Sequence, residues 1–116
     1  MNVLLFAVLL SMLIQPQPTK RKLLLFGESD ANHIEQLTLL KQDSTGMADR
    51  DLILMVVEDR QVYNEYKVKP NQFMLVLIGK DGSEKLRSAK PIDAETIFRL
   101  IDSMPMRQAE MSKKKN

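Results

Sequence analysis

The run FMLVLIGKDGSEKLRS, residues 73–88, sets the fold class of this 116-residue chain. Apolar residues fill positions 73–78, and polar and apolar residues alternate over positions 84–88. Between the two lies Gly79-Lys80-Asp81-Gly82, and an Asp-Gly pair tolerates the positive φ that a tight turn requires. The stretch therefore predicts an antiparallel hairpin, whose first strand is buried and whose second has one wet face. It does not match a phosphate-binding loop, because that pattern ends in Gly-Lys-Ser/Thr and leads into a helix.

Two apolar runs upstream of the hairpin predict two more strands. Residues 23–26 (LLLF) end at Gly27, and residues 52–57 (LILMVV) end at a charged Glu-Asp-Arg triplet. Neither run contains a polar residue, which is typical of strands buried on both faces.

Three segments with helical spacing separate or follow the strands. The first has Asp30 or Asn32 as its cap, the second has Asp59, and the third has Asp93 and ends at Pro105. Their apolar faces are predicted to consist of Ile34, Leu37 and Leu40 in the first, Val62, Tyr63 and Tyr66 in the second, and Ala94, Ile97, Phe98 and Ile101 in the third.

The resulting order is β-α-β-α-β-β-α over residues 21–111. The crossover rule makes the first two connections parallel, and the hairpin makes the last pair antiparallel. The predicted fold is α/β: a three-layer sandwich in which helices cover both faces of a four-stranded mixed sheet. This is the thioredoxin-like arrangement.

The amino-terminal segment predicts export. Residues 3–14 (VLLFAVLLSMLI) span about 18 Å as a helix, short of the ~30 Å hydrocarbon core of a bilayer. The length fits the apolar region of a signal peptide over residues 1–14, with cleavage between 14 and 19. A buried first strand or core helix is the alternative interpretation. We expect a linker at residues 15–20, a basic flexible tail at 112–116, and a periplasmic or secreted protein with no stable membrane span after cleavage.

Composition excludes several kinds of chemistry. The chain has no cysteine, which rules out disulfides, thiol catalysis and cysteine-based metal sites. It has one histidine, and 17 basic residues against 15 acidic ones leave a formal charge of +2, too balanced to indicate nucleic-acid binding. We expect no cofactor and no metal.

Three stretches carry a resemblance to a known family. Residues 50–59 (RDLILMVVED), 77–93 (LIGKDGSEKLRSAKPID) and 100–111 (LIDSMPMRQAEM) resemble the bacterial family called domain of unknown function 4174. Relatives of that domain occur in vertebrate extracellular proteins of the coiled-coil-domain-containing class, and the similarity extends over residues 21–111. The resemblance implies a thioredoxin-like fold distantly related to peroxiredoxins. The family has no established activity, so no site residues are transferred.

The loop at residues 27–32 (GESDAN) stands where thioredoxin-like enzymes place their attacking cysteine. It contains no sulfur, and Ser29 has no redox couple with which to replace a thiolate. Pro70 is a candidate for the cis-proline of such folds, with an ordinary loop proline as the alternative. His33 is interpreted as a surface helix residue rather than a general base or pH sensor. Glu58 with Asp59 is interpreted as a solvated loop rather than a Ca²⁺ or Mg²⁺ site.

The methionine-rich terminus at residues 104–111 is the candidate interaction surface, through Met104, Met106, Arg107, Glu110 and Met111. Packing of these methionines against the core and a Cu(I) site are the alternatives. Two functional hypotheses follow. The first is a non-catalytic module that binds a ligand or an envelope or extracellular protein. The second is an enzyme or redox accessory related to peroxiredoxins, with chemistry that the sequence does not identify.

Overall fold

The computed structural model describes residues 20–115, which form four strands and five helices. The signal peptide predicted at residues 1–14 and the linker up to residue 19 lie outside the described residues. Within residues 20–115, no helix has the length and hydropathy needed to cross a membrane. The elements are β1 (Arg21–Phe26), α2 (Ala31–Lys41), α3 (Ser44–Asp49), β2 (Leu52–Val56), α4 (Arg60–Glu65), β3 (Met74–Ile78), β4 (Glu84–Ser88), α5 (Ala94–Asp102) and α6 (Pro105–Lys115).

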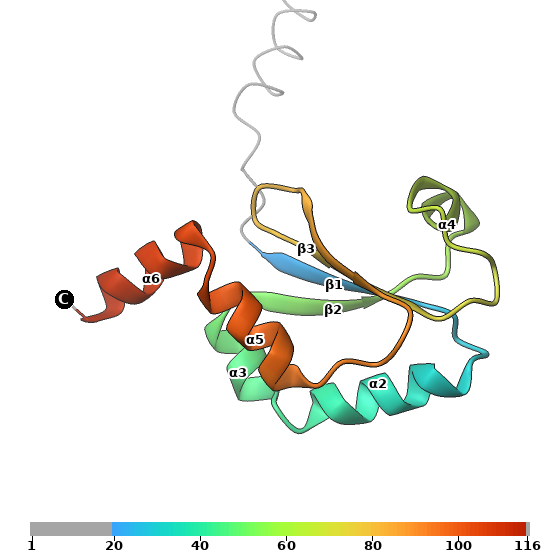
Figure 1. Cartoon of the computed structure of the whole chain (residues 1–116), viewed down its shortest axis with the longest axis horizontal. Coiled ribbons are helices and arrows are strands. Elements are labelled where there is room, and N and C mark those ends of the chain that lie inside the picture. The colour runs from blue at the N-terminus through green and yellow to red at the C-terminus, as the bar shows by residue number, and fades with distance from the viewer. Residues whose placement is uncertain (1–19, 116) are drawn as a thin grey trace, which may run out of the picture.

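The strands form one mixed sheet in the order β2-β1-β3-β4 (Figure 1). β1 and β2 are parallel, β1 and β3 are antiparallel, and so are β3 and β4. The four-stranded mixed sheet and the hairpin are confirmed. The prediction that the second connection is also parallel was wrong. α4 has only six residues, about 9 Å of helix, and stays at the end of the sheet, so the chain enters β3 from the end at which β2 leaves it.

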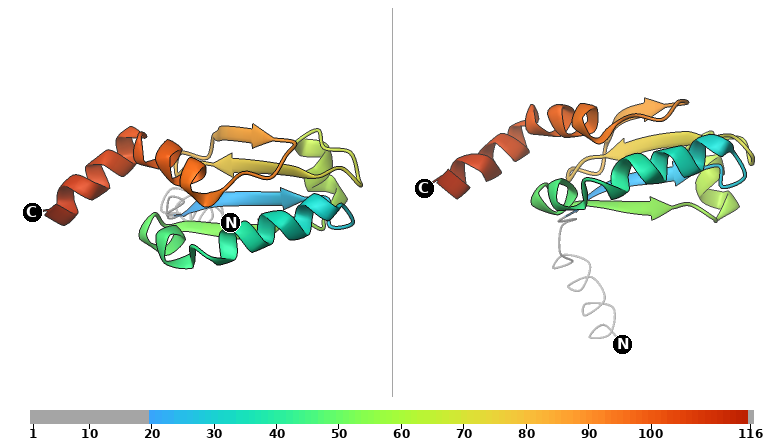
Figure 2. Two further views of the ribbon diagram at one scale, coloured as in Figure 1. Left: turned by 60° about the horizontal axis from the view of Figure 1, so that its bottom comes forward. Right: turned by 90° about the horizontal axis from the view of Figure 1, so that it is seen from below.

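Two apolar clusters lie on the two faces of the sheet. α2, α3 and α5 cover one face (Figure 2), where Leu23, Leu25, Leu75 and Leu77 are completely buried. The other face carries a second cluster that includes Phe26 and is packed by α4. The predicted stripe of α5 is confirmed, with Asp93 as the cap of the helix.

α2 is rotated relative to the predicted face: Leu37 and Leu40 pack on the core as predicted, but Ile34 does not. Ile34 is 68% exposed, whereas His33, Gln36 and Leu40 are buried. The expectation that His33 lies on the surface was therefore wrong. Gln36 explains the rotation, because its side-chain amide accepts from Ile92 N–H and donates to Ile92 C=O, both at 2.8 Å. An apolar side chain at this position could not form hydrogen bonds with the backbone N–H and C=O of Ile92, and buried polar groups need such partners.

The sheet has two unlike edges. β2 is not buried on both faces as predicted: Ile53, Met55 and Val56 are each about two-fifths exposed, because β2 is an edge strand. β4 forms the opposite edge, and its wet face is confirmed, with an ion pair of 2.9 Å between Glu84 and Arg87.

The carboxyl-terminal segment forms a separate helix after α5. α5 ends at Asp102, and Pro105 begins α6, which extends away from the sheet (Figure 1). Proline suits the first position of a helix because its missing N–H would have no partner there. Residues 112–115, expected to form a basic flexible tail, continue α6.

Candidate functional site

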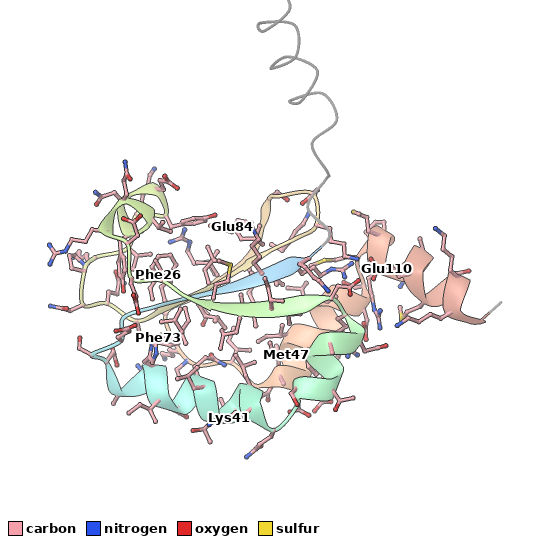
Figure 3. All side chains as sticks on the ribbon, turned by 180° about the vertical axis from the view of Figure 1, so that it is seen from behind. Phe26, Lys41, Met47, Phe73, Glu84 and Glu110 are labelled. Atoms are coloured by element: carbon pink, nitrogen blue, oxygen red, sulfur yellow. The ribbon has the colours of Figure 1, made fainter. Side chains whose placement is uncertain are left out.

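A cleft of about 380 Å³ opens at the carboxyl ends of β1 and β2. It is lined by the loop after β1, the start of α4 and the loop before β3. The lining residues are Glu28, Ser29, Val57, Glu58, Arg60, Tyr63, Pro70 and Asn71. Open α/β sheets bind ligands at this end of their parallel strands. In Figure 3, Phe26 and Phe73 mark this end of the sheet and Glu110 marks the opposite end.

The cleft is held in shape by a turn at Gly27 and by Tyr63. Gly27 has φ +84° and donates its N–H to Tyr63 Oη at 2.8 Å. The Tyr63 ring packs edge-on against Phe26 with centroids 4.9 Å apart. Because Tyr63 is buried and accepts this bond, α4 and the loop after β1 are joined across the cleft.

Polar and apolar residues both line the cleft, the apolar ones being Val57 and Pro70. Glu28, Ser29, Glu58 and Arg60 are all exposed. In the part of the chain that the structure describes, Ser29 makes no side-chain hydrogen bond to an imidazole or a carboxylate. His33 is buried in α2 and does not line the cleft. The two carboxylates and the guanidinium in the lining can bind a small polar or charged group.

Two further candidates from the sequence lie at this end. Pro70 lines the cleft, but every peptide bond within residues 20–115 is trans, so it is not a cis-proline. Asp59 caps α4 by accepting from Gln61 N–H at 2.8 Å. Over the same residues, no group of three or more His, Asp or Glu side chains is placed to hold a metal ion.

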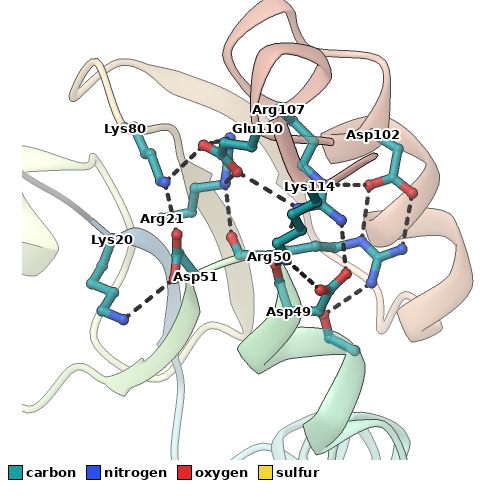
Figure 4. A network of polar contacts seen from close by, with 11 residues as sticks. Lys20, Arg21, Asp49, Arg50, Asp51, Lys80, Asp102, Arg107, Glu110 and Lys114 are labelled. Carbon is teal, nitrogen blue, oxygen red and sulfur yellow. Dashed lines mark hydrogen bonds and ion pairs between the residues drawn. The ribbon is translucent and has the colours of Figure 1, made fainter. Parts of the chain in front are cut away.

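The predicted interaction surface on α6 divides into two parts. Met106 is 50% exposed, whereas Met104 packs against the core and Met111 is half-buried. Arg107 is only 3% exposed and Glu110 is partly covered, because both belong to a network of ion pairs. We call this network the ionic cluster (Figure 4); it comprises Lys20, Arg21, Asp49, Arg50, Asp51, Lys80, Asp102, Arg107, Glu110 and Lys114.

The ionic cluster attaches α6 to the amino ends of β1 and β2. Glu110 accepts from both terminal nitrogens of Arg21 at 3.2 Å and from Lys80 Nζ at 2.7 Å. Arg107 donates to the carboxylates of Asp49 and Asp102 at 2.8 and 3.0 Å. The side chains of Arg21 and Arg107 are only 1% and 3% exposed, whereas their acidic partners Glu110, Asp49 and Asp102 keep contact with water.

The pKa values of the acids follow from these contacts. Burial alone would raise the pKa of Glu110, but hydrogen bonds from Arg21 and Lys80 bring it below its usual value. Hydrogen bonds from Lys114 and Arg107 lower the pKa of Asp49 to about 2. A hydrogen bond from Arg50 lowers the pKa of Asp102. Because the pKa values of these acids are lowered in the folded chain, their ionised forms contribute to the stability of the fold at neutral pH.

Similarity to known proteins supports the fold and not an activity. Residues 57–110 match the profile of the family described as "Domain of unknown function (DUF4174)", which confirms the resemblance over this part of the chain. Coiled-coil domain-containing protein 80 from Danio rerio is 37% identical over 54 residues, which are 46% of this chain and 6% of that protein. The chain therefore spans only a small part of that relative.

Among solved structures, the mitochondrial 2-cys peroxiredoxin from Plasmodium falciparum is similar in fold. The TM-score is 0.53 and the sequence identity 13%, over 83% of this chain and 80% of that one. The fold of this chain is therefore thioredoxin-like, as its sequence predicted. The low identity shows nothing beyond the fold.

Proposed function

We propose that this chain is an exported, thioredoxin-like module that binds a segment of an envelope or extracellular protein without covalent chemistry. The cleft beside Gly27 carries this proposal. The cleft is lined by the loop after β1, where thioredoxin-like enzymes place a thiol, and the chain has no cysteine. A cleft that remains where the reactive group is missing supports binding as its role.

The charge of the lining indicates the chemistry of the segment. The lining contains two carboxylates, Glu28 and Glu58, and one cation, Arg60. The caps of α2 and α4, Asp30 and Asp59, add negative charge next to the lining in sequence. A cleft with this balance favours a cationic group over an anionic one. The proposed occupant is a lysine or arginine side chain of the partner.

A titration with two short peptides tests this assignment. The probes are acetylated, amidated pentapeptides with one central lysine or one central glutamate among alanines. We expect the lysine peptide to shift the amide resonances of Gly27, Ser29 and Glu58, and the glutamate peptide to leave them in place. The double variant Glu28→Gln/Glu58→Gln is expected to weaken binding about tenfold, because two partly solvated charge pairs are lost.

Glu35→Gln is the matched control, since Glu35 is exposed on α2 and lies outside the cleft. It removes the same kind of charge and is expected to leave the affinity unchanged. Equal binding of both peptides, or equal weakening by Glu35→Gln, would overturn the assignment of the cleft.

Export is tested separately by the intact mass of the protein from the extracytoplasmic and cytoplasmic fractions of its host. We expect an extracytoplasmic species shortened by about 15–20 residues, as cleavage of a signal peptide implies. A full-length cytoplasmic species would contradict export while leaving the peptide titration valid as a test of the cleft.

A further inference from the structure

The β2 edge of the sheet carries an unusual concentration of exposed apolar side chains. Of the five large hydrophobic residues that are exposed within the described part of the chain, three lie on this five-residue strand: Ile53, Met55 and Val56. The strand contains no proline, lysine or bulge, the devices with which edge strands usually avoid pairing. The opposite edge, β4, carries a lysine, Lys85, between the charged residues Glu84 and Arg87.

The backbone of β2 has free groups on its outer side. Arg21 donates its N–H to Asp51 C=O, and Val57 donates its N–H to Leu25 C=O. Because pairing groups alternate along a strand, Ile53 and Met55 direct theirs at β1. The N–H and C=O groups of Leu52, Leu54 and Val56 therefore point outward, away from the sheet.

From these features we infer that β2 pairs antiparallel with β2 of a second copy of this chain, which joins the two sheets into one. In a two-fold arrangement centred on Leu54, Ile53 lies opposite Met55 of the second copy on one face, and Leu52 lies opposite Val56 on the other. Each exposed apolar side chain of the strand thereby gains an apolar neighbour.

The surface beside β2 fits this occupant. A hollow of about 330 Å³ lies between α3 and β2, with Met47, Ala48 and Leu52 in its lining. Val56 of the second copy, opposite Leu52, comes beside this hollow. The strand thus ends in an exposed apolar residue, Val56, and begins beside a partly apolar hollow, as a two-fold contact requires.

Charged residues flank β2 at both ends. Glu58 and Asp59 follow its carboxyl end and are exposed. Arg50 precedes its amino end and is already paired with Asp102 at 2.9 Å, and Asp51 there is paired with Lys80 at 2.9 Å. These charged groups therefore add no pairing across the two-fold axis, and the apolar side chains and free backbone groups of β2 carry the contact.

Analytical ultracentrifugation of the full chain over a range of concentrations tests the inference. A contact built on one short strand lies at the low end of the area of stable dimers, so we expect dissociation at micromolar concentrations. Ile53→Lys and Met55→Lys are each expected to weaken the dimer by roughly 100-fold, because every substitution enters the contact from both copies. Ile34→Lys and Met106→Lys are the matched controls; they make the same replacements at residues that are 68% and 50% exposed elsewhere and are expected to leave the dimer intact.

Hydrogen exchange distinguishes strand pairing from other association. The amides of Leu54 and Val56 are expected to become protected as the dimer forms and to exchange freely in Met55→Lys. A chain that stays monomeric at several hundred micromolar would overturn the inference. A dimer that persists in both Ile53→Lys and Met55→Lys would also overturn the inference. In that case another part of the chain, such as the apolar residues 3–14, would hold the two copies together.

Discussion

Gly27→Ala is expected to lower the free energy of unfolding by about 3 kcal/mol, from about 1 kcal/mol of backbone strain and about 2 kcal/mol of overpacking. Gly27 has φ +84°, a conformation that alanine adopts only with strain. A Cβ there would also lie 2.6 Å from the carbonyl oxygen of Gln72 and 2.7 Å from Phe73 Cα. Both are backbone atoms of the segment that enters β3, so neither can move aside as a flexible side chain would.

The chain contains a control that separates the two contributions. Gly82 has the same φ of +84°, but a Cβ there would meet nothing within 4 Å. Gly82→Ala should therefore show the strain alone, about 1 kcal/mol. Urea unfolding of both variants measures the difference. Equal losses would mean that the loop after β1 relaxes away from Gln72, and that the cleft is less firmly shaped than the geometry indicates.

Glu110→Ala is expected to lower the free energy of unfolding by about 3 kcal/mol, because it leaves buried cations without their shared carboxylate. Arg21 and Lys80 both donate to Glu110, and their side chains are 1% and 11% exposed. Glu95→Ala is the control: it removes the same kind of side chain from an ion pair with Arg99, four residues apart on α5, in which both side chains are more than 70% exposed. That variant should lose less than about 0.5 kcal/mol.

The loss caused by Glu110→Ala should depend on pH. Since the folded pKa of Glu110 lies below its usual value of 4.5, its contribution is complete above pH 4.5 and declines as the pH falls through the folded value. The difference between the wild type and Glu110→Ala is therefore expected to be smaller at pH 3 than at pH 7 in urea unfolding. An equal difference at both pH values would show that lost packing, and not lost charge, destabilises the variant.

Local sequence signals predicted the elements that depend on neighbouring residues. The Asp81-Gly82 turn, the Asp93 cap and the apolar stripe of α5 each involve residues within a few positions of one another, and all three are confirmed. The direction of β3 was not predictable in this way. The crossover rule gives the handedness of a connection between two parallel strands, and it applies only where the chain returns to the end at which the first strand began. The rule does not predict that α4 is too short for that return.

Some features of the candidate sites depend on contacts between residues far apart in the sequence, which local patterns do not reveal. The sequence predicts that Arg107 and Glu110 belong to an interaction surface because they lie in a methionine-rich segment. Their partners lie far away in the chain: Arg21 and Glu110 are 89 positions apart, and Arg107 and Asp49 are 58 apart. Similarly, the position of the cleft was indicated by the loop at 27–32, but Asn71 joins it only because β3 runs antiparallel to β1. No local sequence pattern predicts that Asn71 lies beside the loop at 27–32.

The ionic cluster and the cleft occupy opposite ends of strands five or six residues long, about 17–20 Å apart. Substitutions that far apart, with no shared partner, combine additively in their effects on stability. Variation in the loops that bound the cleft therefore leaves the attachment of α6 intact, and a strengthened cluster can compensate for a recognition loop that costs stability. An engineer could exchange residues 28–30 or 58–60 for other recognition sequences and treat the far end of the domain as a constant scaffold.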